Sequence, residues 1–371
     1  MERFWKTDSA DTPMVLVHYG KLIANLDDMA EFAEASRVKL RPHAKTHKTA
    51  EITQLQRERG AIGITVAKIG EAEEMAIRGC ANILIAYPII GHSKLKRLLA
   101  LAEQIQVSTI IDSLEGAQAL SSFFASQNRR IDVYVKVDSG LQRCGKKPGQ
   151  EAADFTRRIA DLPGIRLIGL LTHAGHAYGA SEPHLLEKIA RDEARSLLDT
   201  AALLNQAGLQ VSEISVGSTP TVKISGSVPG VTEIRPGNYV FYDMTQVRLG
   251  VVPMERCALR ILTQVVSRPA PDRIVTDAGA KTLALDRGAH GVEGVSGYGL
   301  IVDYPAAEIE RLSEEHGVVK VSPADPIQVG DLLEIIPNHA CPVVNLADEL
   351  IVVDDRGLRD RWQVIARGKV K

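Results

Sequence analysis

The sequence predicts an α/β protein, in which a (β/α)8 barrel of the TIM type is joined to a second, smaller, mainly antiparallel β domain. Two observations support this prediction. From about residue 20 to 245, short β-rich runs alternate with longer segments of helical periodicity, which is typical of a parallel sheet built from βα units. Beyond that point, short strands follow one another between Pro and Gly turns. We therefore assign residues 20–245 to the barrel, and residues 1–19 and 246–371 to the β domain.

Eight runs rich in β-branched residues supply the strands of the predicted barrel. Amphipathic stretches lie between most of them. Eight strands with intervening helices favour a closed barrel, whose functional sites form at the C-terminal ends of the strands. The predicted strands are residues 40–43, 63–66, 83–86, 108–112, 133–137, 167–172, 213–216 and 234–239, and the predicted helices are 22–36, 70–78, 93–104, 114–127, 150–162 and 182–207.

The predicted β domain takes its first strand from the N-terminal part of the chain. Residues 14–18 are apolar and precede the first helical stretch, so they fit a strand better than a helix. The other strands are residues 257–267, 273–277, 317–321, 331–336 and 350–353.

Composition excludes several classes of function. The chain has 371 residues and a net charge of -2, so no global field attracts nucleic acid or an anionic membrane. No apolar run reaches the roughly 20 residues that a membrane span needs. The four cysteines form no CxxC pair, which argues against a disulfide framework or a zinc ribbon. We expect a cytoplasmic protein without nucleic-acid or membrane partners.

The first candidate site is the basic octet at residues 41–48 (RPHAKTHK), which follows the first predicted barrel strand. A lysine among cations and imidazoles is held partly in its neutral, nucleophilic form, as amine chemistry on a carbonyl cofactor requires. Lys45 is therefore the candidate nucleophile. The alternative interpretation is a solvated basic loop.

Two glycine turns at later strand ends are candidates for a phosphate site. Gly217, Ser218 and Thr219 form a small hydroxyl-bearing turn, and residues 235–239 (RPGNY) follow the next strand. Such turns offer N–H and hydroxyl groups to a phosphate, and adjacent late strands are the usual place for one in a barrel. Either segment can also be only a turn.

Two further loops carry candidate polar groups. Residues 136–145 contain Arg143 in a glycine-bracketed loop, where its guanidinium can act as a fixed donor to an anionic oxygen. His173, His176 and Tyr178 follow another strand, and an imidazole there can stack on a ring or serve as a general base. A surface arginine and structural histidines are the alternatives.

The last candidate lies in residues 337–342 (PNHACP) of the β domain. If this segment is extended, residues two apart point to the same face, so His339 and Cys341 can share one metal ion. Two protein ligands leave positions open for water and substrate, as in a catalytic site. A buried cysteine beside an incidental histidine is the alternative.

Taken together, these segments resemble the fold-type III pyridoxal-phosphate enzymes, and within them the D-threonine aldolase and D-serine dehydratase group. The resemblance covers nearly the whole chain. It rests on residues 41–48, 137–145 (VDSGLQRCG), 217–219 (GST), 277–279 (DAG) and 339–341 (HAC). The octet and the HxC segment are the specific motifs.

The resemblance implies a role for each candidate residue. Lys45 would form the Schiff base with pyridoxal 5'-phosphate and exchange protons with the substrate, and Arg143 would bind the phenolic oxygen of the cofactor. His173 would lie against the ring, and His176 would be a candidate base. The phosphate would be held by Gly217, Ser218, Thr219, Gly237 and Asn238, with Tyr239 beside them. His339 and Cys341 would bind a divalent metal, Mn, Mg or Zn, that takes the substrate hydroxyl.

The resemblance implies a lyase that acts on β-hydroxy-D-amino acids and forms a homodimer. Retro-aldol cleavage by a D-threonine aldolase is the leading expectation. Dehydration of D-serine or D-threo-3-hydroxyaspartate is the alternative, and Cys341 favours it because dehydratases of this group use a thiolate ligand. A racemase and a non-catalytic cofactor-binding homeostasis protein are remoter alternatives: we find no tyrosine that clearly supplies the racemase base, and homeostasis proteins resemble the barrel alone.

Overall fold

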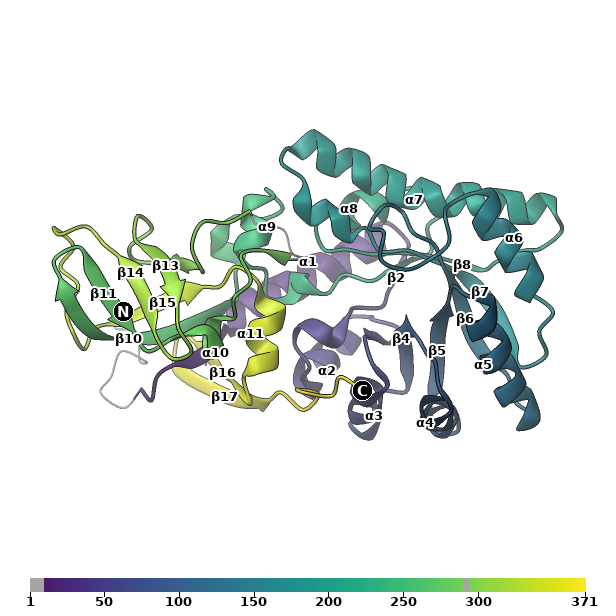
Figure 1. The fold of residues 1–371 in the computed structure, drawn as a ribbon, viewed down its shortest axis with the longest axis horizontal. Helices are drawn as coiled ribbons and strands as arrows, with labels where there is room; N and C mark the ends of the chain where they lie inside the picture. Colours follow the sequence, from purple (N-terminus) through teal and green to yellow (C-terminus); the bar gives the residue numbers. More distant parts are fainter. Residues whose placement is uncertain (1–9, 290–293) are drawn as a thin grey trace. The chain divides into compact units, whose positions relative to one another are not determined.

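A computed structural model of the chain describes residues 10–289 and 294–371, and its ribbon is drawn in Figure 1. Residues 1–9, which the sequence analysis assigned to the β domain, lie outside this description. The contacts divide the chain into two compact units. The barrel unit comprises Met29–Lys45, Ile52–Gly237 and Gly368–Lys371, and the described part of the β unit comprises residues 10–28, 46–51, 238–289 and 294–367. The predicted domains differ from these units at residues 20–28, 46–51, 238–245 and 368–371.

The barrel unit is built on an eight-stranded parallel sheet in the order β2-β9-β8-β7-β6-β5-β4-β3. The two ends of this order are also joined. The Thr65 amide on β3 donates to the Pro42 carbonyl at 2.7 Å, and the Ile62 amide donates to the Leu40 carbonyl at 3.0 Å. The sheet therefore closes into a barrel. The strands are β2 (Lys39–Leu40), β3 (Ile64–Val66), β4 (Asn82–Pro88), β5 (Gln106–Ile111), β6 (Ile131–Lys136), β7 (Ile165–Leu171), β8 (Glu213–Val216) and β9 (Glu233–Ile234).

Helices cover the outside of these strands, as the labels of α4 to α7 in Figure 1 show. In α6, residues Ala152, Phe155, Thr156 and Ile159 are buried. This spacing places them on one face, which packs towards the sheet. The predicted helices are confirmed within a few residues. They are α1 (Tyr19–Ala35), α3 (Ile69–Ile77), α4 (His92–Ala102), α5 (Leu114–Ser126), α6 (Gln150–Ile159) and α7 (Pro183–Gln206), and α2 (Ala50–Glu58) and α8 (Val222–Ser225) complete the set.

The barrel interior combines apolar and charged groups. Leu84, Ile110, Tyr134 and Leu171, from four neighbouring strands, form one buried cluster. Nearby, the Arg41 side chain, 6% exposed, donates through Nε to Glu233 at 2.7 Å and through Nη1 to Asn82 at 2.6 Å. A buried charge persists only when it is paired and hydrogen-bonded, and this guanidinium meets both conditions.

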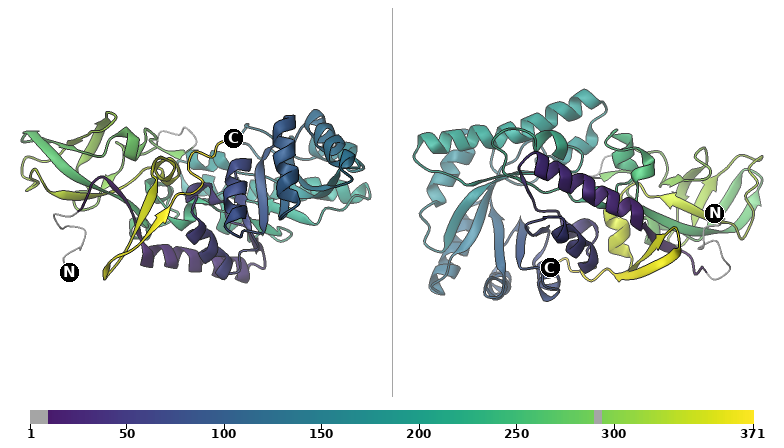
Figure 2. Two further views of the ribbon diagram at one scale, coloured as in Figure 1. Left: turned by 90° about the horizontal axis from the view of Figure 1, so that it is seen from below. Right: turned by 180° about the vertical axis from the view of Figure 1, so that it is seen from behind.

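The β unit contains a nine-stranded sheet in the order β13-β14-β11-β10-β1-β16-β17, with β12 and β15 joined to β10 through β15. Strand β1 pairs antiparallel with β10 and parallel with β16, which confirms that residues 14–18 supply a strand to this sheet. Figure 2 shows the hairpin of β16 and β17 in yellow. The strands are β1 (Met14–His18), β10 (Leu259–Ala270), β11 (Arg273–Thr276), β12 (Leu300–Ile301), β13 (Glu308–Leu312), β14 (Gly317–Lys320), β15 (Leu332–Ile336), β16 (Glu349–Asp354) and β17 (Gly357–Gln363).

Local structure differs from the prediction at the ends of two barrel strands and at residues 337–342. The first barrel strand was predicted over residues 40–43, but β2 ends at Leu40, and Ala44–Thr46 form a 3-10 turn. The last barrel strand was predicted over residues 234–239, but it ends at Ile234, and Asn238–Val240 form a 3-10 turn. Pro236 cannot donate a hydrogen bond to a neighbouring strand, which accounts for the early end. The sequence analysis considered an extended conformation for residues 337–342, but Ala340–Leu346 form helix α11. The β unit has two further short helices, α9 (Met244–Arg248) and α10 (Ala280–Leu283).

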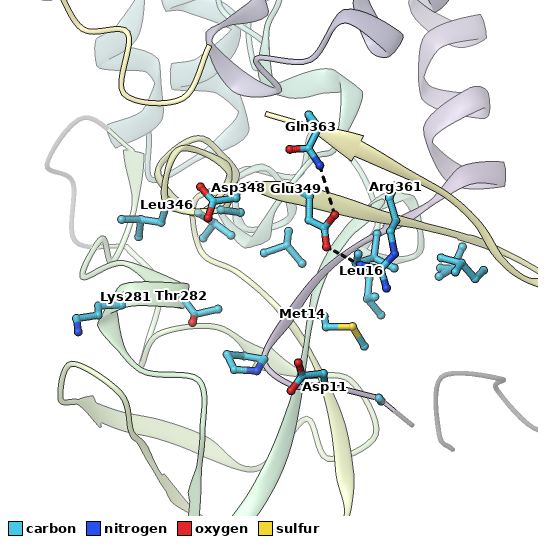
Figure 3. Close-up of a pocket in the computed structure, with 18 residues that line it drawn as sticks. Asp11, Met14, Leu16, Lys281, Thr282, Leu346, Asp348, Glu349, Arg361 and Gln363 are labelled. Carbon is cyan, nitrogen blue, oxygen red and sulfur yellow. Dashed lines mark hydrogen bonds and ion pairs between the residues drawn. The ribbon is translucent and has the colours of Figure 1, made fainter. Parts of the chain in front are cut away.

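A cavity of about 720 Å³ lies within the β unit (Figure 3). It is lined by Met14 and Leu16 of β1, by Lys281 and Thr282 of α10, and by the end of α11. None of the predicted site residues is among those that line it. Among the residues that the structure describes, no helix is both long and apolar enough to cross a membrane.

Candidate active site

The octet that contains Lys45 is not a solvated loop. Arg41, His47 and Lys48 are 6%, 0% and 6% exposed, and Lys45 is half-buried in a 3-10 turn just beyond β2. The Lys45 amide donates to Nδ1 of His43 at 3.3 Å. Lys48 Nζ donates to Asn345 at 2.7 Å. The structure therefore rules out the interpretation of the octet as exposed surface.

The turn at Gly217–Thr219 directly follows β8, as predicted, but its groups have different partners from those expected. The Gly217 amide donates to Oε1 of Glu193 at 3.1 Å, so this N–H is already satisfied. A Cβ at position 217 would lie 3.0 Å from the Cβ and N atoms of Arg235, so glycine is needed for the close approach to the next strand. Ser218 Oγ is buried and has no hydrogen-bond partner in the described part of the chain. That hydroxyl is one group in this turn that an anion can bind.

Glu193 is a site residue that the sequence analysis missed. It lies on α7, is 0% exposed, and accepts hydrogen bonds from the Ala174 amide at 3.2 Å and from Thr221 Oγ1 at 2.7 Å, besides Gly217. One carboxylate therefore joins the loops that follow β7 and β8. The sequence did contain a signal for its burial. Glu193 lies seven residues after Leu186 and four before Leu197, so helical periodicity places it on the apolar face of α7.

The two histidines after β7 occupy different surroundings. His173 Nδ1 lies 2.6 Å from the Gly217 carbonyl, and since a carbonyl only accepts, Nδ1 carries the proton. His176 lies against the loop after β6, where a Cβ at Gly140 would be 3.0 Å from its Nε2. Gly140 has φ +129°, a conformation that side chains rarely adopt, so glycine is required there on both counts. Nδ1 of His176 is buried without a partner among the described residues.

Arg143 is exposed, and the loop that carries it is tightly organised. Oδ1 of Asp138 accepts from the amides of Gly140 at 3.0 Å and Gln142 at 3.1 Å. The charge of Arg143 also acts on Lys136, the last residue of β6. The loop that carries Arg143 is therefore ordered beyond the end of β6, while the side chain of Arg143 is exposed.

Lys136 and Arg235 are two further cations that the sequence analysis did not select. Lys136 is fully buried, and desolvation, with the charges of Arg235 and Arg143, lowers its pKa to about 7. Arg235 is also buried; its Nη1 donates to Ser215 Oγ at 2.5 Å, and its Nη2 donates to the Thr172 carbonyl. Arg143, Arg235 and, in its protonated form, Lys136 thus lie near the C-terminal ends of the barrel strands, where their positive charge favours an anionic ligand.

Gly237 ends the central segment of the barrel unit, and Asn238 and Tyr239 begin the next segment of the β unit. Tyr239 is fully buried. Asn238 Nδ2 donates to Oδ2 of Asp243 at 2.6 Å, so this amide group is committed within the protein. Its Oδ1 atom is buried with no partner in residues 10–289 and 294–371. An oxygen acceptor does not suit a phosphate, so the side chain of Asn238 offers a phosphate no free donor in this geometry, and the phosphate-binding role of Asn238 stays a prediction.

Asp243 organises the start of helix α11. It caps α9, where its Oδ1 accepts from the Gln246 amide at 3.2 Å, and its Oδ2 accepts from the Ala340 amide at 2.9 Å. Burial raises its pKa, and the charge of His339 and these hydrogen bonds partly offset the effect. The carboxylate therefore fixes the backbone beside the predicted metal ligands.

His339 and Cys341 come together in a different way from the one predicted. His339 is the N-cap residue of α11, and Cys341 lies in the first turn of the helix. The N-cap residue is extended and the helix turns the chain directly after it, so the two side chains meet without an extended segment. Burial lowers the pKa of His339, but Cys341, which forms a side-chain hydrogen bond with it, and the Asp286 carboxylate outweigh this and raise it to about 10.

Each member of this pair has a partner on another segment. His339 Nδ1 lies 2.8 Å from Oδ2 of Asp286, and Cys341 Sγ lies 3.3 Å from Oγ1 of Thr46, the residue that follows Lys45 in the chain. Within the described ranges, no group of three His, Cys, Asp or Glu side chains is arranged to hold a metal ion. An imidazole and a thiol are nevertheless ligands that divalent transition metals accept, with the other positions left to water or substrate.

The chain matches two family models. The model of the alanine racemase N-terminal domain matches residues 17–245, and the model of the putative serine dehydratase domain matches residues 258–353. The first of these covers more than half of the chain, and its range includes every strand of the barrel.

Curated relatives match over almost the whole chain. A D-threonine aldolase from an Arthrobacter species is 32% identical over 96% of this chain and 93% of its own length. A D-threo-3-hydroxyaspartate dehydratase from Delftia sp. strain HT23 is also 32% identical, over 89% of this chain and 91% of its own.

Solved structures of the same two kinds of enzyme share the fold. The D-threonine aldolase of Filomicrobium marinum is 30% identical, with a TM-score of 0.90 over 97% of both chains. A variant of the D-threo-3-hydroxyaspartate dehydratase with a cysteine replaced by alanine, in the metal-free form, is 31% identical, with a TM-score of 0.88 over 96% of this chain and 97% of its own. The chain therefore belongs to the family of D-threonine aldolases and D-serine dehydratases, pyridoxal-phosphate enzymes with the fold of alanine racemase, and is an enzyme of the lyase type.

Proposed function

We propose that this enzyme is a pyridoxal-phosphate- and metal-dependent lyase that acts on β-hydroxy-D-amino acids. The observation that carries the proposal is the pairing of His339 with Cys341 at the start of α11, in a chain whose barrel presents Lys45 at a strand end. A racemase does not need such a metal pair, and a protein that only binds the cofactor does not need the domain that carries it.

The residues of the barrel fit the cofactor. Ser218 offers a buried hydroxyl without a partner among the described residues, and Arg143, Lys136 and Arg235 make the strand ends electropositive. An anionic ligand with a phosphate and an ionised ring oxygen suits these groups. The amine of Lys45 suits a carbonyl group.

Bound together, pyridoxal phosphate draws electrons from the substrate α carbon and the divalent metal polarises the β-hydroxyl group. In our proposal Lys45 Nζ holds the cofactor and exchanges a proton with the α carbon. His173 is held by its Nδ1–H bond to Gly217, so that its ring keeps one orientation beside the cofactor site. His339 and Cys341 hold the metal, and His176 is the candidate base for the hydroxyl proton.

Two outcomes are open to such a site, and retro-aldol cleavage of D-threonine is the activity that we propose first. It is supported by the aldolase relative, which aligns over 96% of this chain. Removal of the hydroxyl proton then breaks the Cα–Cβ bond and gives glycine and an aldehyde.

Dehydration is the second candidate, and Cys341 favours it. In the dehydratase, structures were solved for variants with a histidine or a cysteine replaced by alanine, and those two positions are two apart, like His339 and Cys341. In this case Lys45 takes the α proton, the hydroxyl group leaves, and hydrolysis gives a keto acid and ammonia. Among Mn, Mg and Zn, a thiolate ligand suits zinc best.

The experiment that tests the proposal is product analysis with D-threonine and D-serine, before and after treatment with a chelator. Glycine and acetaldehyde from D-threonine would support the aldolase, and pyruvate and ammonia from D-serine would support the dehydratase. Turnover that survives complete removal of the metal would contradict both. A homodimer is also proposed from the resemblance, and sedimentation equilibrium tests it.

A further inference from the structure

We propose that Asp286 is a positioning residue of the metal site, whose carboxylate holds the His339 ring so that Nε2 is the nitrogen that binds the metal. This inference rests on the proposed function, because it takes His339 as a metal ligand. It adds a residue that neither the motif nor the comparisons with relatives assign.

The geometry gives the direction of the hydrogen bond. Asp286 Oδ2 lies 2.8 Å from Nδ1 of His339, and the two side chains are 43% and 18% exposed. An ionised carboxylate can only accept, so Nδ1 of His339 donates.

With Nδ1 occupied by its proton, the ring of His339 can bind a metal only through Nε2. A ring held at one nitrogen also cannot flip or rotate freely about its Cβ–Cγ bond. The main chain beside it is fixed independently, because the Ala340 amide donates to Asp243 at 2.9 Å. Asp286 therefore restrains the imidazole ring itself, whereas the helix cap fixes only the main chain beside it.

The carboxylate also changes the affinity of the ring for a cation. A carboxylate that accepts from the second nitrogen raises the basicity of an imidazole ligand, and loss of such partners typically reduces metal affinity by roughly 10–100-fold. Direct ligation by Asp286 is the competing role. It is disfavoured because, in the described part of the chain, Asp286, His339 and Cys341 do not form a group of three that can hold one ion.

Metal titration of variants tests the proposal without any turnover. Protein stripped with a chelator is titrated with cobalt(II) ions, and binding is followed by the absorption that a cysteine thiolate gives with cobalt. Asp286→Ala removes the acceptor, and we expect its Kd to rise roughly 10–100-fold while the stoichiometry stays at one ion per chain. Asp286→Asn keeps a neutral acceptor for Nδ1–H, so its Kd should lie between those of Asp286→Ala and the wild type.

Controls separate this role from a structural one and from failure of the metal site itself. Glu315→Gln breaks an exposed ion pair with Lys281 elsewhere in the β unit, and we expect the wild-type Kd. If Asp286 had only a structural role, Asp286→Ala would lower the melting temperature of the metal-free protein and leave the Kd for cobalt unchanged. That result would overturn the proposal. Loss of the one-to-one cobalt stoichiometry in Asp286→Asn alone would also overturn it. If wild-type protein binds no cobalt at all, the proposed metal site is wrong rather than the role of Asp286.

Discussion

The barrel unit and the β unit hold their site residues in different ways. In the barrel, the candidate residues follow the ends of strands, so the repeated βα pattern brings them to one end of the sheet. In the β unit, His339 and Cys341 lie at the start of a seven-residue helix, and Asp243, Asp286 and Thr46 hold that region from distant parts of the sequence. Topology brings the first set together, and Glu193 then joins two of its loops, whereas the second set depends on individual hydrogen bonds throughout.

The difference predicts how each set responds to substitution. Residues placed by topology should lose their chemistry without loss of structure when they are replaced. Replacement of a residue that accepts several hydrogen bonds or holds a ligand side chain should instead lower the stability of the protein or its affinity for metal. The following predictions test this contrast, from the largest expected effect to the smallest.

The largest effect is expected for Lys45→Ala, which removes the amine that we assign to proton exchange. Turnover should fall by roughly 10⁴-fold, at the upper end of what general acid–base groups contribute, with little change in melting temperature. Steady-state kinetics and thermal unfolding measure the two quantities. Lys39→Gln is the matched control, since Lys39 lies on β2 with its side chain 48% exposed, and it should retain activity.

His339→Ala should lower turnover by roughly 10³-fold, because the metal contributes several kcal/mol to stabilisation of the developing charge. Since the barrel supplies the cofactor site, the variant should keep the absorption of bound cofactor. Spectra and rates of the same sample separate these outcomes. Bleaching of the cofactor absorption in this variant, or full activity, would show that the assignment of roles to the two units is wrong.

Glu193→Ala should destabilise the protein by about 2–5 kcal/mol, because the amides of Ala174 and Gly217 and the hydroxyl of Thr221 lose a buried acceptor. Glu193→Gln retains one acceptor oxygen and should cost less. Urea unfolding of cofactor-free protein measures both. If Glu193→Ala had the same free energy of unfolding as the wild type, the loops after β7 and β8 would not depend on the Glu193 carboxylate.

Lys136→Met should stabilise the cofactor-free protein at neutral and lower pH. The pKa of Lys136 is about 7 in the folded protein and ordinarily 10.5, so between these values the unfolded chain binds the extra proton. Wild-type stability therefore rises between about pH 7 and 10.5, and the advantage of methionine, a few kcal/mol below pH 7, should shrink as the pH rises. Unfolding at pH 6 and pH 10 tests this, with exposed Lys147→Met as the control that shows no such trend.

The fold could be predicted from the sequence because the alternation of strand and helix patterns repeats along the chain. Each of the eight predicted barrel strands overlaps an observed strand, and the strand at residues 14–18 is confirmed, since each is an apolar run bounded by turns. The predicted end of the last barrel strand was wrong, because Pro236 stops the pairing of β9 with its neighbours before residue 239. Periodicity does not show where an individual hydrogen bond is lost.

The site was less accessible to sequence reasoning. The pair His339 and Cys341 was selected from an extended geometry, which the structure replaces with a helix cap, and its role as a metal site stays a prediction. The sequence analysis did not select Glu193, which is one of several charged residues of α7, or Lys136, which lies within a strand. Both residue types are common at such positions, and these two side chains are unusual only because they are buried. A buried charged residue of this kind can be recognised as part of a site only when the three-dimensional structure shows which groups surround it.

The central claim is that Lys45 carries the cofactor, and peptide mapping after borohydride reduction tests it most directly. Purified protein loaded with pyridoxal phosphate is reduced, digested and analysed by mass spectrometry. The account predicts one modified peptide, with the pyridoxyl group on Lys45, and none in Lys45→Ala. Stoichiometric modification of another lysine, such as the buried Lys136, with Lys45 unmodified would contradict it.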